Sequence, residues 1–395
     1  MTLPRALVPL VLVLVIGALA ACSDGGASES GLQFKTIELP RTAGSTARVV
    51  ALAQCDGTWW AAGSTISGDG VRRPALWRSD DAAGWEAVAT APVSYYGEKA
   101  ELYSVAAGPA GVVAVGAASG GAHGNPRTAS WVVDGDRLRE VPAPFEQYGG
   151  PRAISVRAVA AGPDGFVIIG MRRAANERTG GVAWVSPDGQ AFTLLDTDPA
   201  LQSATDELVH PLDVAGTPDG FAAVGDVMRS GRGTLDTEGI IWTSPDGHAW
   251  TRLAVGADDL GVAGSVSVAA AAGSPTGLAA AGVATHDEGS DVIVWRAQSG
   301  GGWARERLAG WGADPLVTAL AADGPVLVVA GRRGDRAVTA VSDGAGRYWR
   351  VASLPDGAPA GAHVDVDVAA AQGVAVVAAA DDTRAGIWRA VLPNG

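Results

Sequence analysis

Short stretches of alternating apolar and polar residues, separated by tight turns, recur along most of the chain. The run from Ile240 to Thr251 contains one such unit in full: residues alternate up to Thr243, Pro245-Asp246-Gly247 turns the chain, and Trp250 opens the returning stretch. Alternation with a period of two is typical of strands that bury one face. In the turn, proline presets φ, the aspartate accepts hydrogen bonds from free N–H groups, and glycine takes the φ > 0 position. The run therefore predicts a β-hairpin.

The hairpin belongs to a larger unit that repeats with a period of roughly 45–58 residues. Each unit predicts an inner strand rich in Val and Ala, a second strand that ends in glycine, a third strand with tryptophan, and a fourth strand that opens with an aromatic residue. The units begin near Val49, Leu102, Ser155, Pro211, Ser265, Leu316 and Val364. The glycines are Gly63, Gly116, Gly170, Gly225, Gly282 and Gly331, and the tryptophans are Trp77, Trp131, Trp184, Trp242, Trp295 and Trp388. Repeats of this size and strand content predict an all-β, seven-bladed β-propeller.

The last unit stops at Ile387 to Leu392 without a fourth strand, and the start of the chain can supply one. Phe34 to Pro40 shares an aromatic residue followed five and six positions later by Leu-Pro with the segment Trp349 to Pro355 of the preceding unit. If this N-terminal strand completes the last blade, the ring closes and two free sheet edges disappear. We therefore expect residues 32–395 to form one domain, its last blade closed by the N-terminal strand.

Two of the turns carry a family resemblance. The segments Ser186 to Phe192 and Ser244 to Trp250 resemble the Asp-box (BNR) repeats of sialidase-like β-propellers, and Ser79 to Trp85 is a looser version. The family pattern is Ser-x-Asp-x-Gly-x-x-Trp, and the two best copies here are one residue shorter. The resemblance covers nearly the whole mature chain as architecture and implies a propeller. It does not imply an activity, because Asp-boxes lie on structural turns in enzymes and non-enzymes alike.

The first residues predict export and anchoring. Arg5 precedes an apolar run, Ala6 to Ala18, which is too short for an ordinary membrane span, and Leu19-Ala20-Ala21-Cys22 resembles the lipobox of bacterial lipoproteins. We expect residues 1–21 to be a lipoprotein signal peptide and Cys22 to carry the lipid that anchors the protein to the cell membrane on its extracytoplasmic side. Residues 22–31 predict a lipidated tether. A plain secretory signal with a chance cysteine is the alternative.

Composition narrows the partner classes. The 395 residues are 47% hydrophobic and 18% charged, which suits a large core, and the net charge of −13 without a basic block argues against nucleic acid. One cysteine, Cys55, remains in the mature chain, so no internal disulfide can form. We expect a monomeric propeller.

The connections between second and third strands, and those between blades, are long, irregular and charged, so we expect the face that carries them to bind a partner. Arginine pairs there could grip a carboxylate or phosphate, although a solvated rim is the simpler interpretation. The predicted binding face comprises Arg172, Arg173, Arg332, Arg333, Arg72, Arg73, His286, Asp287, Tyr95, Tyr96 and Trp311. Further loop residues on this face are His123, Asn125, Arg127, Phe145, Tyr148, Arg152, Asn176 and His210.

The inner strands predict a polar channel lining. Ser104, Asp213, Ser267 and Asp367 align, within a residue, before a recurrent valine. A water-filled channel needs polar walls, so a structural role is the simpler interpretation of this set.

Catalytic and cofactor motifs are absent from the sequence. The five histidines are scattered without metal-ligand spacing, and neither a nucleophile elbow nor a phosphate-binding loop occurs. We assign no catalytic, metal or cofactor residue. The prediction is a non-catalytic cell-envelope binding or scaffold lipoprotein that presents its variable face to an unknown protein or glycan partner. The alternative is a sialidase-like glycan hydrolase or lyase with its site at the channel mouth.

Overall fold

The computed structural model describes residues 32–120, 126–174, 177–231, 235–255, 264–299, 302–344 and 348–393. The predicted signal peptide, the tether with Cys22, and the loop residues His123, Asn125 and Asn176 lie outside the described residues. Within the described part, no helix has the length and apolar character needed to span a membrane.

A four-strand antiparallel meander recurs along the chain. The first strands are β2 (Ser45–Cys55), β6 (Glu101–Gly108), β10 (Ala153–Gly162), β14 (Glu207–Thr217), β18 (Gly264–Ser274), β22 (Pro315–Asp323) and β26 (Asp365–Ala371). The second strands are β3 (Thr58–Ser67), β7 (Gly111–Ala118), β11 (Gly165–Arg173), β15 (Gly220–Ser230), β19 (Gly277–His286), β23 (Val326–Arg333) and β27 (Val374–Ala380). The third strands are β4 (Arg72–Ser79), β8 (Arg127–Asp134), β12 (Thr179–Ser186), β16 (Leu235–Ser244), β20 (Gly289–Ala297), β24 (Arg336–Ser342) and β28 (Ala385–Val391). The fourth strands are β5 (Glu86–Ala91), β9 (Arg137–Glu140), β13 (Thr193–Leu195), β17 (Thr251–Val255), β21 (Trp303–Arg307), β25 (Trp349–Ser353) and, from the chain start, β1 (Lys35–Thr36).

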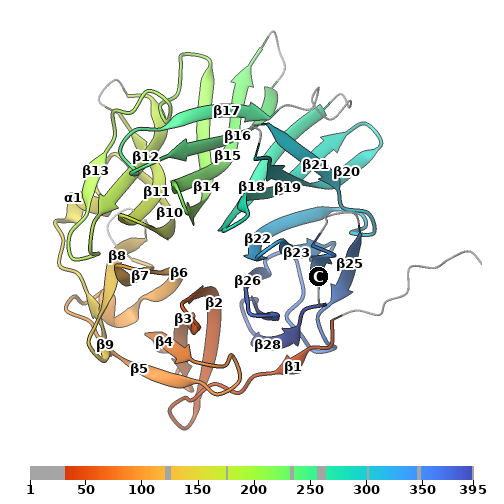
Figure 1. Cartoon of the computed structure of the whole chain (residues 1–395). Helices are drawn as coiled ribbons and strands as arrows, with labels where there is room; N and C mark the ends of the chain where they lie inside the picture. Colours follow the sequence, from red (N-terminus) through yellow and green to blue (C-terminus); the bar gives the residue numbers. More distant parts are fainter. Residues whose placement is uncertain are drawn as a thin grey trace, which may run out of the picture.

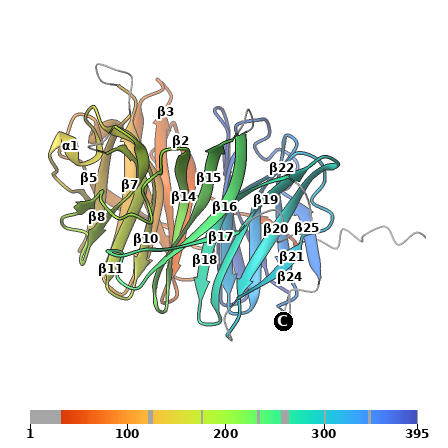
Figure 2. The ribbon, with the colours of Figure 1, turned by 90° about the horizontal axis from the view of Figure 1, so that it is seen from above.

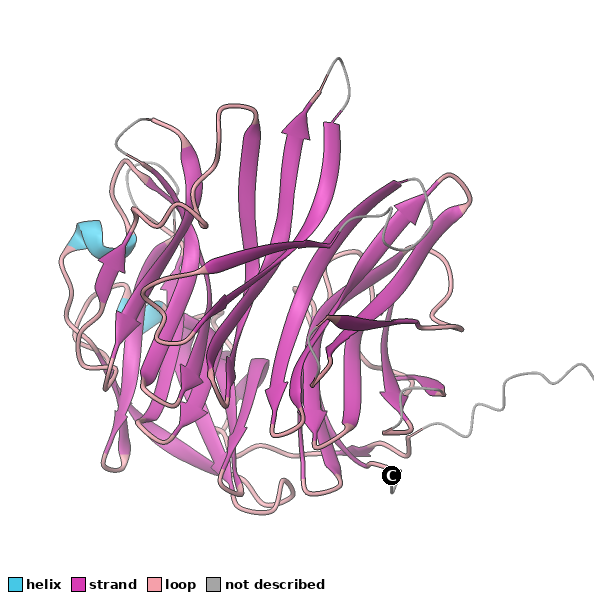
Figure 3. Cartoon of the chain, turned by 45° about the horizontal axis from the view of Figure 1, so that its top comes forward, coloured by secondary structure: helices cyan, strands magenta, loops and turns pink. Residues whose placement is uncertain are grey.

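The meanders stand around a central opening as in a β-propeller, with the first strands innermost (Figure 1). Seen from above the first view, the long strands of neighbouring meanders run side by side (Figure 2). In the described residues the strands form five four-stranded sheets and one eight-stranded sheet, which arises because β5 and β9 pair in parallel. Among the residues that the structure describes, helix occurs as two short pieces between meanders, η1 (Gly97–Lys99) and α1 (Phe145–Tyr148) (Figure 3). Each predicted unit start lies within, or directly before, a first strand.

The predicted pairing of the N-terminal segment with the strand of Trp388 is present. β1 pairs antiparallel with β28, with Lys35 opposite Arg389 and Thr36 opposite Trp388, and the Ile37 amide donates to the Ile387 carbonyl at 2.9 Å. The two chain ends meet in one sheet in this way (Figure 1). Ile37 and Leu39 then enter the core, each 8% exposed.

The third-strand tryptophans lie between neighbouring sheets. Trp242 is fully buried and packs with residues of the preceding meander such as Val167 and Val185. Its indole N–H donates to the Ala200 carbonyl at 2.8 Å, in the segment that enters this meander, and Trp184 makes the same bond to Gln147. These two indoles therefore bury a large apolar surface and also fix the connection between two meanders.

The glycine at the end of the second strand follows from a bulge in the first strand. The pairing register shifts by one residue at Val50, Tyr103, Arg157, Leu212, Ala269 and Thr318. Opposite the shift, a Cβ on Gly170 would lie 2.2 Å from the Ser155 carbonyl oxygen, and one on Gly225 would lie 2.1 Å from that of His210. Only glycine permits this approach, and the bulge then turns the following residue toward the central opening.

The Asp-box-like turns form the hydrogen bonds expected of them. Asp246 Oδ1 accepts from the amides of His248 at 2.8 Å and Ala249 at 3.3 Å, and the Gly247 amide donates to Ser244 Oγ at 2.8 Å. Asp188 and Ser186 repeat the arrangement. The serine and aspartate therefore cap the turn, so these residues serve the fold.

Candidate functional site

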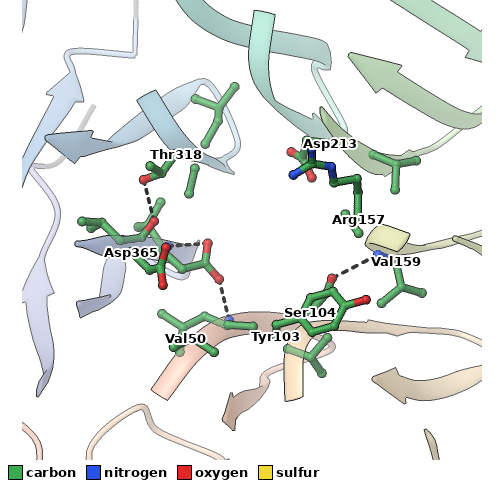
Figure 4. Close-up of a pocket in the computed structure, with 18 of the residues that line it drawn as sticks. Val50, Tyr103, Ser104, Arg157, Val159, Asp213, Thr318 and Asp365 are labelled. Carbon is green, nitrogen blue, oxygen red and sulfur yellow. Dashed lines mark hydrogen bonds between the residues drawn. The ribbon is translucent and has the colours of Figure 1, made fainter. Parts of the chain in front are cut away.

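The inner strands enclose a channel cavity of about 370 Å³. Every first strand contributes to its wall, and Figure 4 shows Tyr103, Ser104, Arg157, Asp213, Thr318 and Asp365 around it. Of the predicted channel-lining set, Ser104, Asp213 and Asp367 contribute to this wall.

These three side chains join neighbouring inner strands. Asp367 accepts the Leu52 amide at 2.6 Å, Asp213 the Ala271 amide at 3.0 Å, and Ser104 the Val159 amide at 3.0 Å. An innermost strand is a sheet edge with unpaired N–H groups, and each of these oxygens satisfies one such group. Burial raises the pKa of Asp213 to about 6 and that of Asp367 to about 7, against the opposing effect of those amides. Their role in the channel is structural.

Ser267 does not belong to the channel wall, so this part of the predicted set is wrong. The bulge at Ala269 shifts the register, and Ala270 takes the place equivalent to Ser104 and Asp213. Ser267 Oγ instead donates to Asp226 Oδ2 at 2.7 Å. A bulge of one residue cannot be located from apolar spacing alone, which explains the error.

Asp226 lies at one end of a chain of polar contacts that ends at Arg157. His210 Nδ1 is 3.5 Å from Asp226 Oδ1, and its Nε2 is 3.0 Å from Arg157 Nη2. A guanidinium can only donate, so His210 Nε2 is the acceptor in this contact. Ser267 bonds to the carboxylate and not to the histidine, so the three side chains do not form a nucleophile–base pair.

The carboxylate of Glu101, which also lines the channel, accepts contacts from three donors. Its Oε2 lies 3.0 Å from Arg48 Nε, 2.7 Å from Arg72 Nη1 and 2.8 Å from Ser64 Oγ. Arg48 Nη2 also lies 3.6 Å from Asp365 Oδ2. Arg72, predicted for the binding face, is therefore an internal partner of Glu101, whereas its neighbour Arg73 is exposed.

The arginine pairs lie at strand ends and not on loops, contrary to the prediction. Arg172 is 8% exposed, and its Nη1 donates to the carbonyls of Glu146, Gln147 and Gly149 at 3.1–3.5 Å. Arg332 donates to the Gly334 carbonyl at 2.8 Å, and Arg333 to Ser353 Oγ at 3.3 Å. Arg173 stays half exposed, 3.6 Å from Glu177. Of these four arginines Arg173 is exposed, Arg172 is buried, and Arg332 and Arg333 are half buried.

We therefore expect opposite outcomes for two adjacent arginines. Arg172→Ala should lower the free energy of unfolding by about 1.5–3 kcal/mol, because three backbone carbonyls lose a charged, buried donor. Arg173→Ala should change it by less than about 0.5 kcal/mol, because its ion pair is solvated. Urea unfolding of both variants checks this, and equal stability of the two would contradict it.

The other predicted binding-face residues divide between core and surface. Trp311 is 2% exposed and its indole donates to the Arg332 carbonyl at 2.9 Å, so its assignment to the surface is wrong. His286 lies 3.0 Å from Asp291, and Asp287 is exposed. Tyr95 and Tyr96 pack edge to face at 5.3 Å, and Tyr95 is 65% exposed. Tyr95 and Asp287 thus face solvent, whereas Tyr96 is half buried.

A groove of about 620 Å³ lies beside the channel mouth, between the meander β6–β9 and the meander β10–β13. Its size is that of a typical ligand site. Tyr103 and Arg157 line both the groove and the channel. The groove is lined by Tyr103, Ala117, Pro126, Arg127, Thr128, Phe145, Tyr148, Gly149, Gly150, Pro151, Ala153, Ile154, Ser155, Val156 and Arg157.

Arg127 forms the outer wall of the groove. Its guanidinium lies 4.2 Å from the ring centre of Phe145 and 5.4 Å from that of Tyr96. It makes no ion pair or hydrogen bond to any residue that the structure describes, and its Nε is buried without a partner. Beyond it lies a second pocket of about 580 Å³, which shares Arg127, Phe145 and Tyr148. These three residues belong to the predicted variable face, but no sequence pattern brings them together with Arg157 and Ile154.

The described side chains of the groove do not favour acid–base catalysis or metal binding. Burial raises the pKa of the Tyr103 and Tyr148 phenols well above the ordinary value, so both stay neutral. Tyr103 already donates to the Val156 carbonyl at 3.0 Å. In the described part of the chain, no group of three or more His, Cys, Asp or Glu side chains could hold a metal ion.

Comparison with known proteins relates this chain to others by fold alone. No protein-family model and no curated protein sequence matches it. Among solved structures, it is similar to an ulvan lyase (TM-score 0.51, 12% identity, covering 89% of this chain and 96% of that one). It is also similar to the acylaminoacyl peptidase of Pyrococcus horikoshii (TM-score 0.50, 9% identity, covering 88% of this chain and 52% of that one). A further similar structure is the β-propeller domain of a trilobed protease from Pyrococcus furiosus (TM-score 0.49, 9% identity, covering 88% of this chain and 95% of that one). The chain thus has an all-β propeller fold, and identities this low carry no function.

Proposed function

We propose that the protein is a non-catalytic binding module whose ligand site is the groove between β6–β9 and β10–β13. One observation carries the proposal: the groove, about 620 Å³ in volume, has an arginine without an ion pair among the described residues and half-exposed apolar side chains. Phe145 and Ile154 are 52% and 49% exposed. Apolar surface that converges with uncompensated charge on a rigid scaffold is typical of a recognition site.

The state of the channel carboxylates supports binding over glycan hydrolysis. A hydrolase needs a pair of carboxyl groups free to act as acid and as base or nucleophile. Here Asp213 and Asp367 accept hydrogen bonds from backbone amides. Glu101 forms ion pairs with two arginines and accepts a hydrogen bond from a serine. The sialidase-like hydrolase or lyase remains the second candidate, because the ring of inner strands forms a cavity at the place where such a site would lie.

We propose a count of seven blades, with the eight-stranded sheet taken as two. Support comes from its two halves, β2–β5 and β6–β9, which are separate antiparallel meanders joined only by three parallel residue pairs between their outer strands. The apolar packing supports the same division. A buried cluster including Leu76 and Leu102 lies between these halves, as other clusters lie between the remaining neighbours.

We propose further that the propeller is held at the extracytoplasmic side of the membrane by a lipid on Cys22, with residues 1–21 removed. The support is the sequence Leu19-Ala20-Ala21-Cys22 after an apolar run. Cys22→Ala should release the protein from the membrane fraction or leave it unprocessed, because no thiol remains for the lipid. Fractionation followed by mass measurement checks this. Normal cleavage together with unchanged membrane retention would contradict it.

The binding role is tested by capture from a detergent-solubilised envelope extract on the immobilised full-length protein. The wild-type protein should capture one or more species from the extract that the Ile154→Glu variant does not capture. The new carboxylate would fill part of the groove and place a negative charge beside its arginines. Arg78→Gln, which removes an exposed arginine paired with Glu86 on another meander, is the matched control and should capture the same species. Identical capture by Ile154→Glu would show that the groove is not the site. New reducing ends or unsaturated products in a glycan mixture would favour the enzymatic candidate.

A further inference from the structure

The charge on the groove wall is opposite to that of the rest of the molecule. The chain has 42 acidic and 29 basic residues, yet the groove is lined by Arg127 and Arg157 and by no carboxylate. Neither arginine forms an ion pair with any residue in the described ranges, and Arg157 Nη2 lies 3.0 Å from His210 Nε2. Two uncompensated cations in an otherwise acidic protein favour an anionic occupant.

The groove between these cations is mostly apolar. Ala117, Pro126, Ile154 and Val156 line it together with the exposed ring of Phe145. Besides the two arginines, its polar side chains are Thr128, Ser155 and the phenols of Tyr103 and Tyr148, and the Tyr103 hydroxyl already donates to the Val156 carbonyl at 3.0 Å. A sugar ring placed over Ala117, Pro126, Ile154 and Val156 would bury hydroxyl groups against apolar side chains, which is unfavourable. An apolar side chain would instead be sheltered from water.

We propose that this groove, the proposed ligand site, recognises a protein segment in which an apolar side chain lies between acidic residues. The apolar side chain would lie over Ile154 and Val156, and the acidic groups would pair with Arg127 at the outer end and Arg157 at the channel end. Arg127 is already held against Phe145, so little rotamer freedom is lost when a carboxylate binds it. The inference rests on the proposed function and narrows its partner to a peptide.

A random dodecapeptide display library panned on the immobilised full-length protein tests the proposal. The enriched peptides should carry Asp or Glu on both sides of Leu, Ile, Phe or Trp. The affinity of a synthetic copy should fall about tenfold or more with Arg127→Gln and with Ile154→Glu, and should fall with added salt. Arg78→Gln should bind it as the wild type does, and unfolding midpoints should show that all variants are folded.

Three outcomes would overturn the inference: no enriched peptide, enriched peptides without acidic residues, or peptides that bind Arg127→Gln unchanged. An oligouronate that binds the wild type but not Ile154→Glu, with no peptide enriched, would reject a peptide partner and leave the groove as the site. If envelope capture is also unaffected by Ile154→Glu, the proposed function itself fails. The two failures are therefore distinguishable.

Discussion

Deleting residues 32–40 from the full-length chain should lower the midpoint of thermal unfolding by more than about 5 °C. The deletion removes the only fourth strand available to the sheet of β26–β28, where β1 pairs with β28. It also removes Ile37 and Leu39 from the core and leaves the Trp77 indole without its acceptor, the Pro40 carbonyl at 2.8 Å. Burial of two such side chains alone contributes about 3–6 kcal/mol. A domain of about 360 residues shifts by roughly 1.3 °C per kcal/mol, so this burial alone accounts for about 4–8 °C.

Glu38→Ala is the control for this deletion. Glu38 lies within the same segment, but its side chain is 84% exposed, and its carboxylate lies 3.9 Å from the half-exposed guanidinium of Arg41. Its removal should leave the midpoint within about 1 °C, since exposed ion pairs contribute little. A deletion variant that unfolds at the wild-type midpoint would show that closure by the N-terminal strand does not stabilise the ring.

Replacing Asp367 with Asn should stabilise the protein at pH 8 and have little effect at pH 4. Asn keeps an oxygen that can accept the Leu52 amide, so the bond between β26 and β2 survives. The pKa of Asp367 is about 7 in the fold because burial disfavours its charged form, whereas an unfolded Asp has a pKa near 3.9. Between pH 3.9 and pH 7 the carboxyl is ionised in the unfolded state but still protonated in the fold. The stability that Asp367 contributes is therefore fully present below about pH 4 and is lost as the pH rises through 7.

The gain at pH 8 should be about 1–3 kcal/mol, less than the full pKa difference implies because water in the channel screens the charge. Asp213→Asn should follow the same trend over a narrower range, since the pKa of Asp213 is about 6. Asp246→Asn is the control of opposite sign: amide donors, chiefly His248, hold the pKa of this turn carboxyl below its ordinary value. Its loss should therefore cost stability at pH 7 and nothing at low pH. Urea unfolding at several pH values decides the matter, and an Asp367→Asn effect independent of pH would contradict the account.

The architecture could be predicted because it depends on residues with local signatures. Alternating apolar residues, Pro-Asp-Gly turns and one tryptophan per unit specify strands, their order and the faces that they bury. Even the pairing of the chain ends could be predicted, since Phe34 to Pro40 repeats the pattern of a fourth strand. The bulges were missed because an extra residue in an apolar strand leaves no mark in composition, and the assignment of Ser267 failed for this reason.

The site was harder to predict because side chains of the same type differ in what surrounds them. Arg172 and Arg173 are adjacent in sequence, yet Arg172 is buried and donates to three backbone carbonyls, whereas Arg173 faces solvent. Trp311 was assigned to the surface by its place in a connection and instead fills the core. The groove combines Tyr103, Arg127, Phe145 and Ile154 from three strands and a helix, and only the packing of two meanders brings them together.

Hydrogen–deuterium exchange of the full-length protein, with and without its captured envelope ligand, tests the binding site most directly. The account predicts that the ligand slows amide exchange in residues 126–128 and 145–157, which line the groove, and leaves the turns at Asp188 and Asp246 unchanged. Slowed exchange at those turns or around Arg332, with none in the groove, would contradict it.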